Sequence, residues 1–158
     1  MSKYSPQWVA NYFDDDSENE WERLIKTPTS EVKLFIHTHY LKEYIRSGDL
    51  VLEVGAGAER FTQIIVELGA RVVVADISEN QLKLNQRYAE ELGFNKGIEN
   101  WLQLDICKMK QLENARFDAV VCYGGLLSYV FDKRNIALQE MLRVLKPKGR
   151  VLISVMSL

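Results

Sequence analysis

The chain has 158 residues, of which 47% are hydrophobic and 27% are charged, so it holds enough apolar material for one globular core. Its net charge of -2 gives no general attraction for nucleic-acid backbones or anionic membranes, which require clustered lysine and arginine. The first residues lack an apolar signal core and no stretch is long and apolar enough to span a bilayer, so we expect a cytoplasmic protein.

Residues 1 to about 30 form a front segment in which an acidic run over 14–20 interrupts several aromatic side chains. So many aromatic residues are unusual in a disordered tail, so we predict that this segment is partly helical and folds over the mouth of a binding site. The acidic run is expected to be a solvated, mobile stretch, with a role as a lid as the alternative. The aromatic residues are Tyr4, Trp8, Tyr12, Phe13 and Trp21.

A longer helix is predicted after Pro28, with Thr29 or Ser30 as its cap. Apolar residues recur at helical spacing up to Ile45, and Ser47-Gly48-Asp49 ends the helix.

From residue 50 onward, strand and helix patterns alternate. Ser78 and Gln81 form a capping box before the second helix, Asp132 can cap the third, and Lys146 to Gly149 reads as a turn. Nearly continuous apolar strands that alternate with helices predict an α/β fold with a parallel sheet covered on both faces. The predicted strands are 50–54, 71–75, 101–104, 117–122 and 150–156, and the predicted helices are about 59–68, 79–92 and 133–145.

The first three of these strands each run into an acidic residue. Asp76 follows 71–75, Asp105 follows 101–104, and Glu53 lies in the run that continues into Gly55-Ala56-Gly57. A buried strand that stops at a glycine turn before a helix leaves bare backbone N–H groups at its carboxyl end. Such an edge is typical of a cradle for a nucleotide or a cofactor.

These motifs, in this order, resemble the class I S-adenosylmethionine-dependent methyltransferases, and specifically the small bacterial members. The resemblance covers roughly residues 49 to 158. The family's usual third glycine is replaced by Glu59, which can lie harmlessly in the first turn of the following helix or narrow the cradle. The motifs are Val51 to Gly57, Asp76, Leu104-Asp105-Ile106, Phe117 to Val120, and Leu142 to Arg150.

The resemblance implies that S-adenosylmethionine is the cofactor. Asp76 would accept hydrogen bonds from both ribose hydroxyls. Asp105 would accept from the adenine amino group, and the Ile106 backbone N–H would donate to the ring. Glu53 would contact the methionine end directly or through water, and the backbone of Gly55, Ala56 and Gly57 would allow close approach. Ile77 and Tyr123 would provide apolar walls.

The predicted reaction is direct transfer of the sulfonium methyl group to an acceptor, with a small molecule favoured and no catalytic residue named. The alternative is a non-catalytic module that binds S-adenosylmethionine or a nucleotide, or a partner subunit. The segment after residue 122 lacks the motif of nucleic-acid amino methyltransferases. A dinucleotide-binding Rossmann domain would need its third glycine at Arg60.

Histidine and cysteine residues do not suggest a metal site. His37 and His39 are two residues apart and face different sides of a helix, although His37 or Tyr12 could border an acceptor pocket. Cys107 and Cys122 lack metal or redox spacing and fit reduced, packed thiols.

We expect one domain over residues 1–158, with a helical N-terminal segment or lid at 1–48 and a cofactor-binding core at 49–158. The predicted fold is a Rossmann-like parallel sheet of about five strands that lacks the family's C-terminal antiparallel strands. The last strand would then lie at an open sheet edge. We favour pairing with a second copy through this strand, with an uncovered monomer or a longer native protein as the alternatives.

Overall fold

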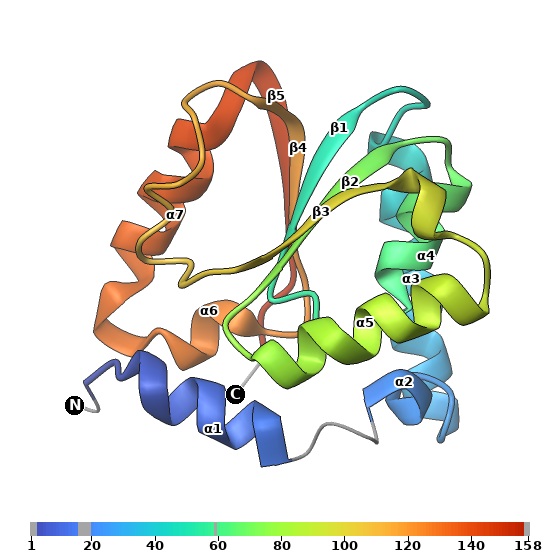
Figure 1. Cartoon of the computed structure of the whole chain (residues 1–158), viewed down its shortest axis with the longest axis horizontal. Helices are drawn as coiled ribbons and strands as arrows, with labels where there is room; N and C mark the ends of the chain where they lie inside the picture. Colours follow the sequence, from blue (N-terminus) through green and yellow to red (C-terminus); the bar gives the residue numbers. More distant parts are fainter. Residues whose placement is uncertain (1–2, 16–19, 59, 157–158) are drawn as a thin grey trace.

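The structure, a computed structural model, describes residues 3–15, 20–58 and 60–156. It confirms the predicted α/β architecture with helices at the N-terminus (Figure 1). The strands are β1 (Leu50–Val54), β2 (Arg71–Asp76), β3 (Ile98–Gln103), β4 (Phe117–Cys122) and β5 (Leu145–Ile153). The helices are α1 (Pro6–Asp15), α2 (Glu20–Arg23), α3 (Pro28–Tyr44), α4 (Phe61–Glu67), α5 (Glu79–Glu91), α6 (Leu126–Tyr129) and α7 (Arg134–Val144), with short 3-10 turns at Asn95–Gly97 and Phe131–Lys133.

The five strands form one parallel sheet in the order β3-β2-β1-β4-β5. All residues of the central strand β1 are buried, because helices cover both faces of the sheet. Leu52 and Val54 pack on the side of α7, whereas Val51 packs on the side of α3, α4 and α5 (Figure 1). This alternation follows from the two-residue period of a strand.

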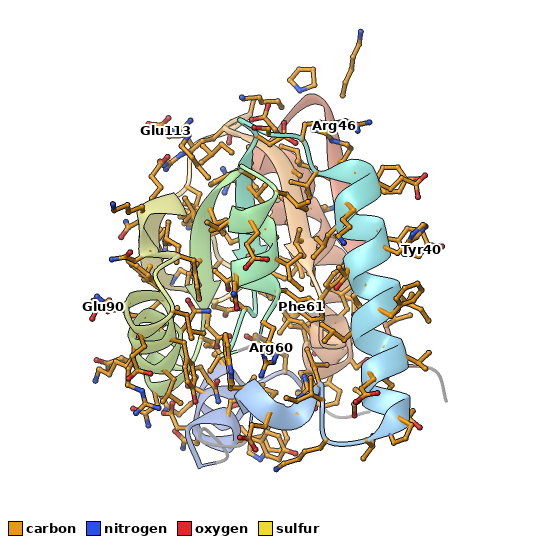
Figure 2. The ribbon with its side chains drawn as sticks, turned by 90° about the vertical axis from the view of Figure 1, so that its right-hand side faces the viewer. Tyr40, Arg46, Arg60, Phe61, Glu90 and Glu113 are labelled. Atoms are coloured by element: carbon orange, nitrogen blue, oxygen red, sulfur yellow. The ribbon has the colours of Figure 1, made fainter. Side chains whose placement is uncertain are left out.

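The side of the sheet covered by α3, α4 and α5 also anchors the N-terminal helices (Figure 2). Phe61 at the start of α4 is 2% exposed and packs into the core. Its neighbour Arg60 donates through Nε to the carbonyl of Trp21 at 3.1 Å, and its guanidinium lies 4.7 Å from the centre of the Trp21 ring. The same ring stacks on Tyr88 of α5 at 4.3 Å. These contacts fix α2 against α4 and α5.

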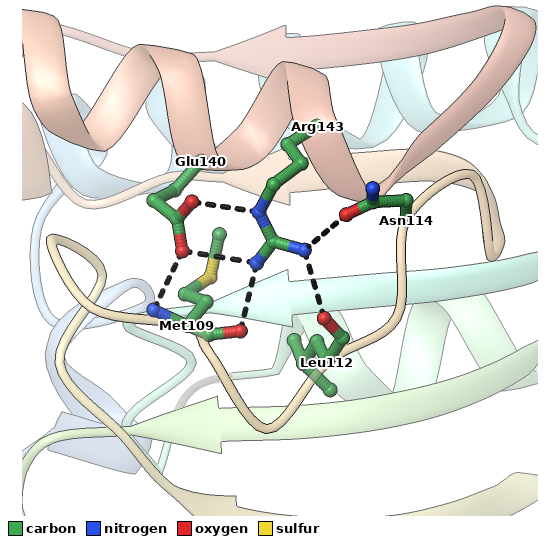
Figure 3. A network of polar contacts seen from close by, with 5 residues as sticks. All are labelled: Met109, Leu112, Asn114, Glu140 and Arg143. Atoms are coloured by element: carbon green, nitrogen blue, oxygen red, sulfur yellow. Dashed lines mark hydrogen bonds and ion pairs between the residues drawn. The ribbon is translucent and has the colours of Figure 1, made fainter.

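On the other side, a polar clamp holds the segment between β3 and β4 against α7 (Figure 3). The Arg143 guanidinium donates to both carboxylate oxygens of Glu140, to the carbonyls of Met109 and Leu112, and to Oδ1 of Asn114, over 2.7–3.0 Å. Glu140 also accepts from the backbone N–H of Met109 at 2.8 Å. All five N–H donors of this arginine are therefore used.

Three predicted helix caps need correction. The cap of α3 is Thr27, whose hydroxyl accepts from the N–H of Ser30 at 3.1 Å, so the prediction of Thr29 or Ser30 was wrong. Pro28 takes the first helical position, where a missing N–H costs nothing. Asp132 does not cap α7, because its carboxylate accepts from the backbone of Tyr4 at 3.0 Å. Ser78 caps α5 as predicted, but the Gln81 side chain bonds elsewhere, so the capping box is only half formed.

The predicted turn at residues 146–149 is part of β5, which begins at Leu145 and ends at Ile153. Leu145 pairs with Phe117 and Arg150 pairs with Ala119, so residues 146–149 form an outward bulge in the strand. Lys148 in this bulge has φ of 66°, which the sequence pattern gave no reason to expect. Glu59 and most of the acidic run, residues 16–19, lie outside the described residues.

Candidate functional site

A cavity of about 220 Å³ lies at the carboxyl ends of the strands, beneath α1. Residues that follow β1, β2, β3 and β4 all reach it, as does α1 itself. Ligands of open parallel sheets bind at this edge, where neighbouring connections diverge to opposite faces. The strand-end residues in the lining are Val54, Gly55, Gly57, Asp76, Ile77, Leu104, Ile106, Tyr123 and Gly124.

The glycine turn after β1 needs both of its glycines. Gly55 has φ of 62° and Gly57 has φ of 52°, a region that side chains rarely adopt. A Cβ added to Gly55 would lie 2.6 Å from Cδ2 of Leu126. At these glycines, the backbone of the turn therefore reaches the cavity wall without a side chain to cover it.

Asp76 at the end of β2 supports this turn and keeps acceptor capacity of its own. Its Oδ2 accepts from the N–H of Gly57 and its Oδ1 from the N–H of Ser78, each at 2.8 Å. A carboxylate oxygen has two lone pairs, so both oxygens can accept one more hydrogen bond. Burial raises the pKa of Asp76 to about 6, although the backbone N–H groups of Ser78, Gly57 and Ile77 favour the ionised form and the charge of Asp14 opposes it.

Glu53 lies behind the cavity in a buried polar network. It is 3% exposed, and its Oε2 accepts from the Thr62 hydroxyl at 2.6 Å. Asn85 of α5 donates to that hydroxyl at 2.8 Å and to the carbonyl of Gly57 at 3.0 Å, and its Oδ1 accepts from the Trp101 indole. Burial raises the pKa of Glu53 to about 8, and the charge of Asp76 adds to the shift. The network ties β1, α4, α5 and β3 to the glycine turn.

Asp105 lies two residues beyond β3, and it accepts hydrogen bonds both from its own loop and from the N-terminal segment. Its Oδ1 accepts from the N–H of Cys107 at 2.8 Å and from the hydroxyl of Tyr4 at 2.7 Å. Burial and the hydrogen bond to Asp105 raise the pKa of Tyr4, so this phenol stays protonated and donates. Within the described residues, the hydroxyl and backbone N–H donors to Asp105 both bond to Oδ1, and none bonds to Oδ2.

The structure brings most of the predicted site residues to one cavity. Glu53 and Ala56 are buried and do not line the cavity, and Asp105 is half-buried beside the cavity wall rather than in it. The predicted residues in the cavity lining are Gly55, Gly57, Asp76, Ile77, Ile106 and Tyr123.

Histidine and cysteine residues lie apart from the cavity lining. His37 packs edge-on against Tyr123, with 4.4 Å between ring centres, and its Nδ1 lies 2.6 Å from the carbonyl of Lys33. Cys107 and Cys122 are free thiols. The part of the chain that the structure describes holds no cluster of three or more potential metal-binding side chains.

The cavity wall also contains residues that were not predicted as site residues from the sequence, among them Arg23, Tyr4 and Gln81. Arg23 of α2 is the one basic residue among the described residues of the lining. Tyr4 also lines the cavity, and Gln81 does so while its Oε1 accepts from the N–H of Ala58 at 2.8 Å. Tyr4 and Arg23 lie far along the chain from the strand ends that they join at the site, so no local motif marks them, and the capping-box pattern of Gln81 gave no sign of a site role.

A family profile described as a methyltransferase domain matches residues 52–153, which is most of the chain and includes every strand end that lines the cavity. The chain belongs to the S-adenosylmethionine-dependent methyltransferases. This methyltransferase is similar to the ubiquinone/menaquinone biosynthesis C-methyltransferase UbiE of Pseudomonas putida, with 35% identity over 113 residues. The match covers 69% of this chain and 42% of that protein, so the chain spans less than half the length of the curated relatives it matches.

Solved structures share the fold of this methyltransferase. PH0226 from Pyrococcus horikoshii OT3 has a TM-score of 0.72 at 23% identity, over 89% of this chain and 59% of that one. A Thiobacillus denitrificans S-adenosylmethionine-dependent methyltransferase in complex with S-adenosyl-L-homocysteine has a TM-score of 0.65 at 20% identity, over 89% of this chain and 53% of that one. None of the helices in the described ranges has both the length and the apolar character needed to cross a membrane.

Proposed function

We propose that this chain binds S-adenosylmethionine in the cavity beneath α1 and transfers its methyl group to a small-molecule acceptor. The observation that carries the proposal is the meeting, in one cavity, of the glycine turn, the Asp76 carboxylate and the apolar Ile77 and Ile106. Asp76 fits the ribose of the nucleoside, because each of its oxygens keeps one acceptor position for a ribose hydroxyl.

We assign the adenine to the wall formed by Ile77 and Ile106. The backbone N–H of Ile106 would donate to the ring, and Oδ2 of Asp105 would accept from the amino group. Both residues follow β3 directly, on the segment that the Arg143 clamp holds in place. A ligand that meets fixed groups loses less free energy to ordering the protein.

We assign the methionine end to the glycine turn and Arg23. The bare backbone of Gly55 and Gly57 allows close approach, and the guanidinium of Arg23 matches the α-carboxylate of the cofactor. Glu53 supports this end through Thr62 and Asn85, which fix the carbonyl of Gly57. Tyr123 at the end of β4 completes the wall.

When bound, S-adenosylmethionine supplies a methyl group on a positively charged sulfur, which a nucleophilic acceptor can displace directly. The residues of this chain need only align the two reactants and exclude water, which can supply much of the rate. Tyr12 and Phe13 on α1 and Tyr129 on α6 give the cavity an aromatic side, with 5.2 Å between the rings of Phe13 and Tyr129. This surface supports a small apolar or aromatic acceptor.

The proposal is tested by incubating the chain with S-adenosylmethionine and a small-molecule fraction of cell extract, and measuring S-adenosylhomocysteine. We expect turnover that depends on the extract and is lost in Asp76→Ala. Cofactor binding without turnover would favour the alternative, a binding module or partner subunit. Absence of both binding and turnover would contradict the proposal.

We also propose that two copies associate through β5 and the neighbouring face of α3. Within the described residues, β5 pairs with β4 on one side only, so its other edge carries unpaired backbone groups. Beside this edge, α3 exposes Ile36 (46%) and Tyr40 (48%), and β5 is followed by Val155 (67%). Tyr40 lies on the outer surface in Figure 2. A groove of about 550 Å³ separates α3 from β5.

Light scattering at micromolar concentration tests the association. We expect a dimer for the natural chain and a monomer for Val155→Lys, because a charge at an exposed strand edge opposes pairing. Lys33→Ala, on the exposed surface of α3, serves as the control. A strictly monomeric natural chain would contradict the proposal.

We further propose a bacterial, cytoplasmic protein. Its two free thiols fit a reducing compartment, and the curated relatives reported above are bacterial. Cell fractionation with an antibody against the chain checks the location.

A further inference from the structure

Helix α1 crosses the carboxyl edge of the sheet and is fastened at both ends (Figure 1). We call residues 4–14 the strap. Val9 in its middle is 2% exposed and, with Tyr12 and Phe13, forms the roof of the cavity. The strap covers the cavity of about 220 Å³, so a ligand of nucleoside size enters or leaves it when the strap opens.

The N-terminal end of the strap is fastened by Tyr4. Its backbone N–H donates to Asp132 at 3.0 Å, and its hydroxyl donates to Oδ1 of Asp105 at 2.7 Å. Asp105 lies on the segment after β3, to which we have assigned the adenine. The strap and the adenine thus use the same carboxylate through different oxygens.

The C-terminal end of the strap is fastened to the segment after β2. The carbonyl of Phe13 accepts from Nε2 of Gln81 at 3.1 Å, and Asp14 accepts from the hydroxyl of Ser78. The N–H of Ser78 donates in turn to Asp76, the carboxylate assigned to the ribose. Both fastenings therefore connect to a carboxylate of the nucleoside site.

We infer that the Tyr4 hydroxyl is the positioning group that links opening and closure of the strap to nucleoside binding through Asp105. The inference rests on the proposed function. A carboxylate held by Tyr4 and by the N–H of Cys107 has a fixed orientation, so Oδ2 is preorganised as an acceptor. By reciprocity, a ligand bound to Oδ2 favours the closed strap by the same factor.

Dissociation of S-adenosylhomocysteine, followed by stopped-flow fluorescence, tests this link. Tyr4→Phe removes one hydroxyl that bonds to a charged group, so we expect about five- to thirty-fold faster release. Gln7→Ala is the matched control, because Gln7 lies on the exposed side of the same helix and bonds only Asn11 among the described residues. Its release rate should stay within about twofold of the natural chain.

The double variant Tyr4→Phe with Asp105→Asn separates a link from a general loss of structure. If the hydroxyl acts through Asp105, Tyr4→Phe should add little to the effect of Asp105→Asn. Unchanged release in Tyr4→Phe, or an equal effect of Tyr4→Phe in both backgrounds, would overturn the inference.

If the natural chain fails to bind S-adenosylhomocysteine, the proposed function fails instead. Hydrogen exchange then still tests the fastening, since Tyr4→Phe should speed exchange of α1 amides, and unchanged exchange would overturn it.

Discussion

Two polar clusters, the Arg143 clamp on α7 and the carboxylates at the cavity, differ in the number of hydrogen-bonding positions still open. In the Arg143 clamp, all five guanidinium donors already have protein partners (Figure 3). At the cavity, Asp76 in the lining and Asp105 beside it accept from the protein and keep lone pairs for a ligand. A saturated cluster stabilises the fold, whereas an unsaturated one beside a cavity can bind. The two clusters should therefore respond differently to substitution.

Arg143→Met should give the largest loss of stability. It removes five hydrogen bonds and leaves the carbonyls of Met109 and Leu112 and the Glu140 carboxylate without their partner. We expect the free energy of unfolding to fall by about 2–4 kcal/mol, measured by urea denaturation. Lys83→Met is the control, because its ion pair with Glu79 is exposed and should contribute less than about 1 kcal/mol. Equal losses of stability for the two substitutions would contradict the stabilising role of the Arg143 clamp.

Asp76→Ala should show the reverse pattern, with its main effect on binding. Loss of the charge-assisted bonds to the ribose should weaken S-adenosylhomocysteine binding by about 1.5–3 kcal/mol, or roughly 10- to 150-fold. Glu99→Gln, on the surface of β3, should leave the affinity unchanged. Calorimetry that finds the same affinity for Asp76→Ala as for the natural chain would contradict the ribose assignment.

Glu53→Gln tests how the buried carboxyl group of Glu53 makes stability depend on pH. The pKa of Glu53 is raised from 4.5 to about 8 by burial, so the folded state retains a proton that the unfolded state has lost. Glu53 therefore lowers the free energy of unfolding as the pH rises from about 4.5 to 8. An amide does not titrate, so the variant should gain on the order of 1–3 kcal/mol at pH above 8 and nothing near pH 4. Thermal denaturation across this range that shows a constant difference would refute the buried carboxylate as the cause.

Thr27→Ala should have the smallest effect, since it belongs to neither cluster. Removing the cap of α3 should lower the free energy of unfolding by about 1 kcal/mol. Thr29→Ala should change it by less than about 0.5 kcal/mol, because Thr29 is exposed and does not cap the helix. A larger loss for Thr29→Ala in urea denaturation would restore the cap predicted from the sequence.

The sequence was informative wherever the signal was local. Apolar runs predicted the strands, and the glycine turn with Asp76 predicted the cradle, because backbone geometry at these places depends on neighbouring residues. Interactions between distant segments could not be predicted in this way. Tyr4 meets Asp105 across 101 positions, and Asn85 joins four elements without any motif of its own. Two of the three corrected caps have the same cause, since tertiary contacts of Asp132 and Gln81 outcompete their local roles, whereas the cap of α3 is a local contact displaced to Thr27.

The central claim is that the cavity beneath α1 holds the nucleoside and the methionine end of the cofactor. An amide chemical-shift titration of the labelled chain with S-adenosylhomocysteine tests it directly. We expect saturable shifts for the amides of Gly55, Gly57, Ile77 and Ile106, with a dissociation constant in the low to middle micromolar range. Shifts confined to α3 and β5, or no saturable shifts at these four amides, would contradict it.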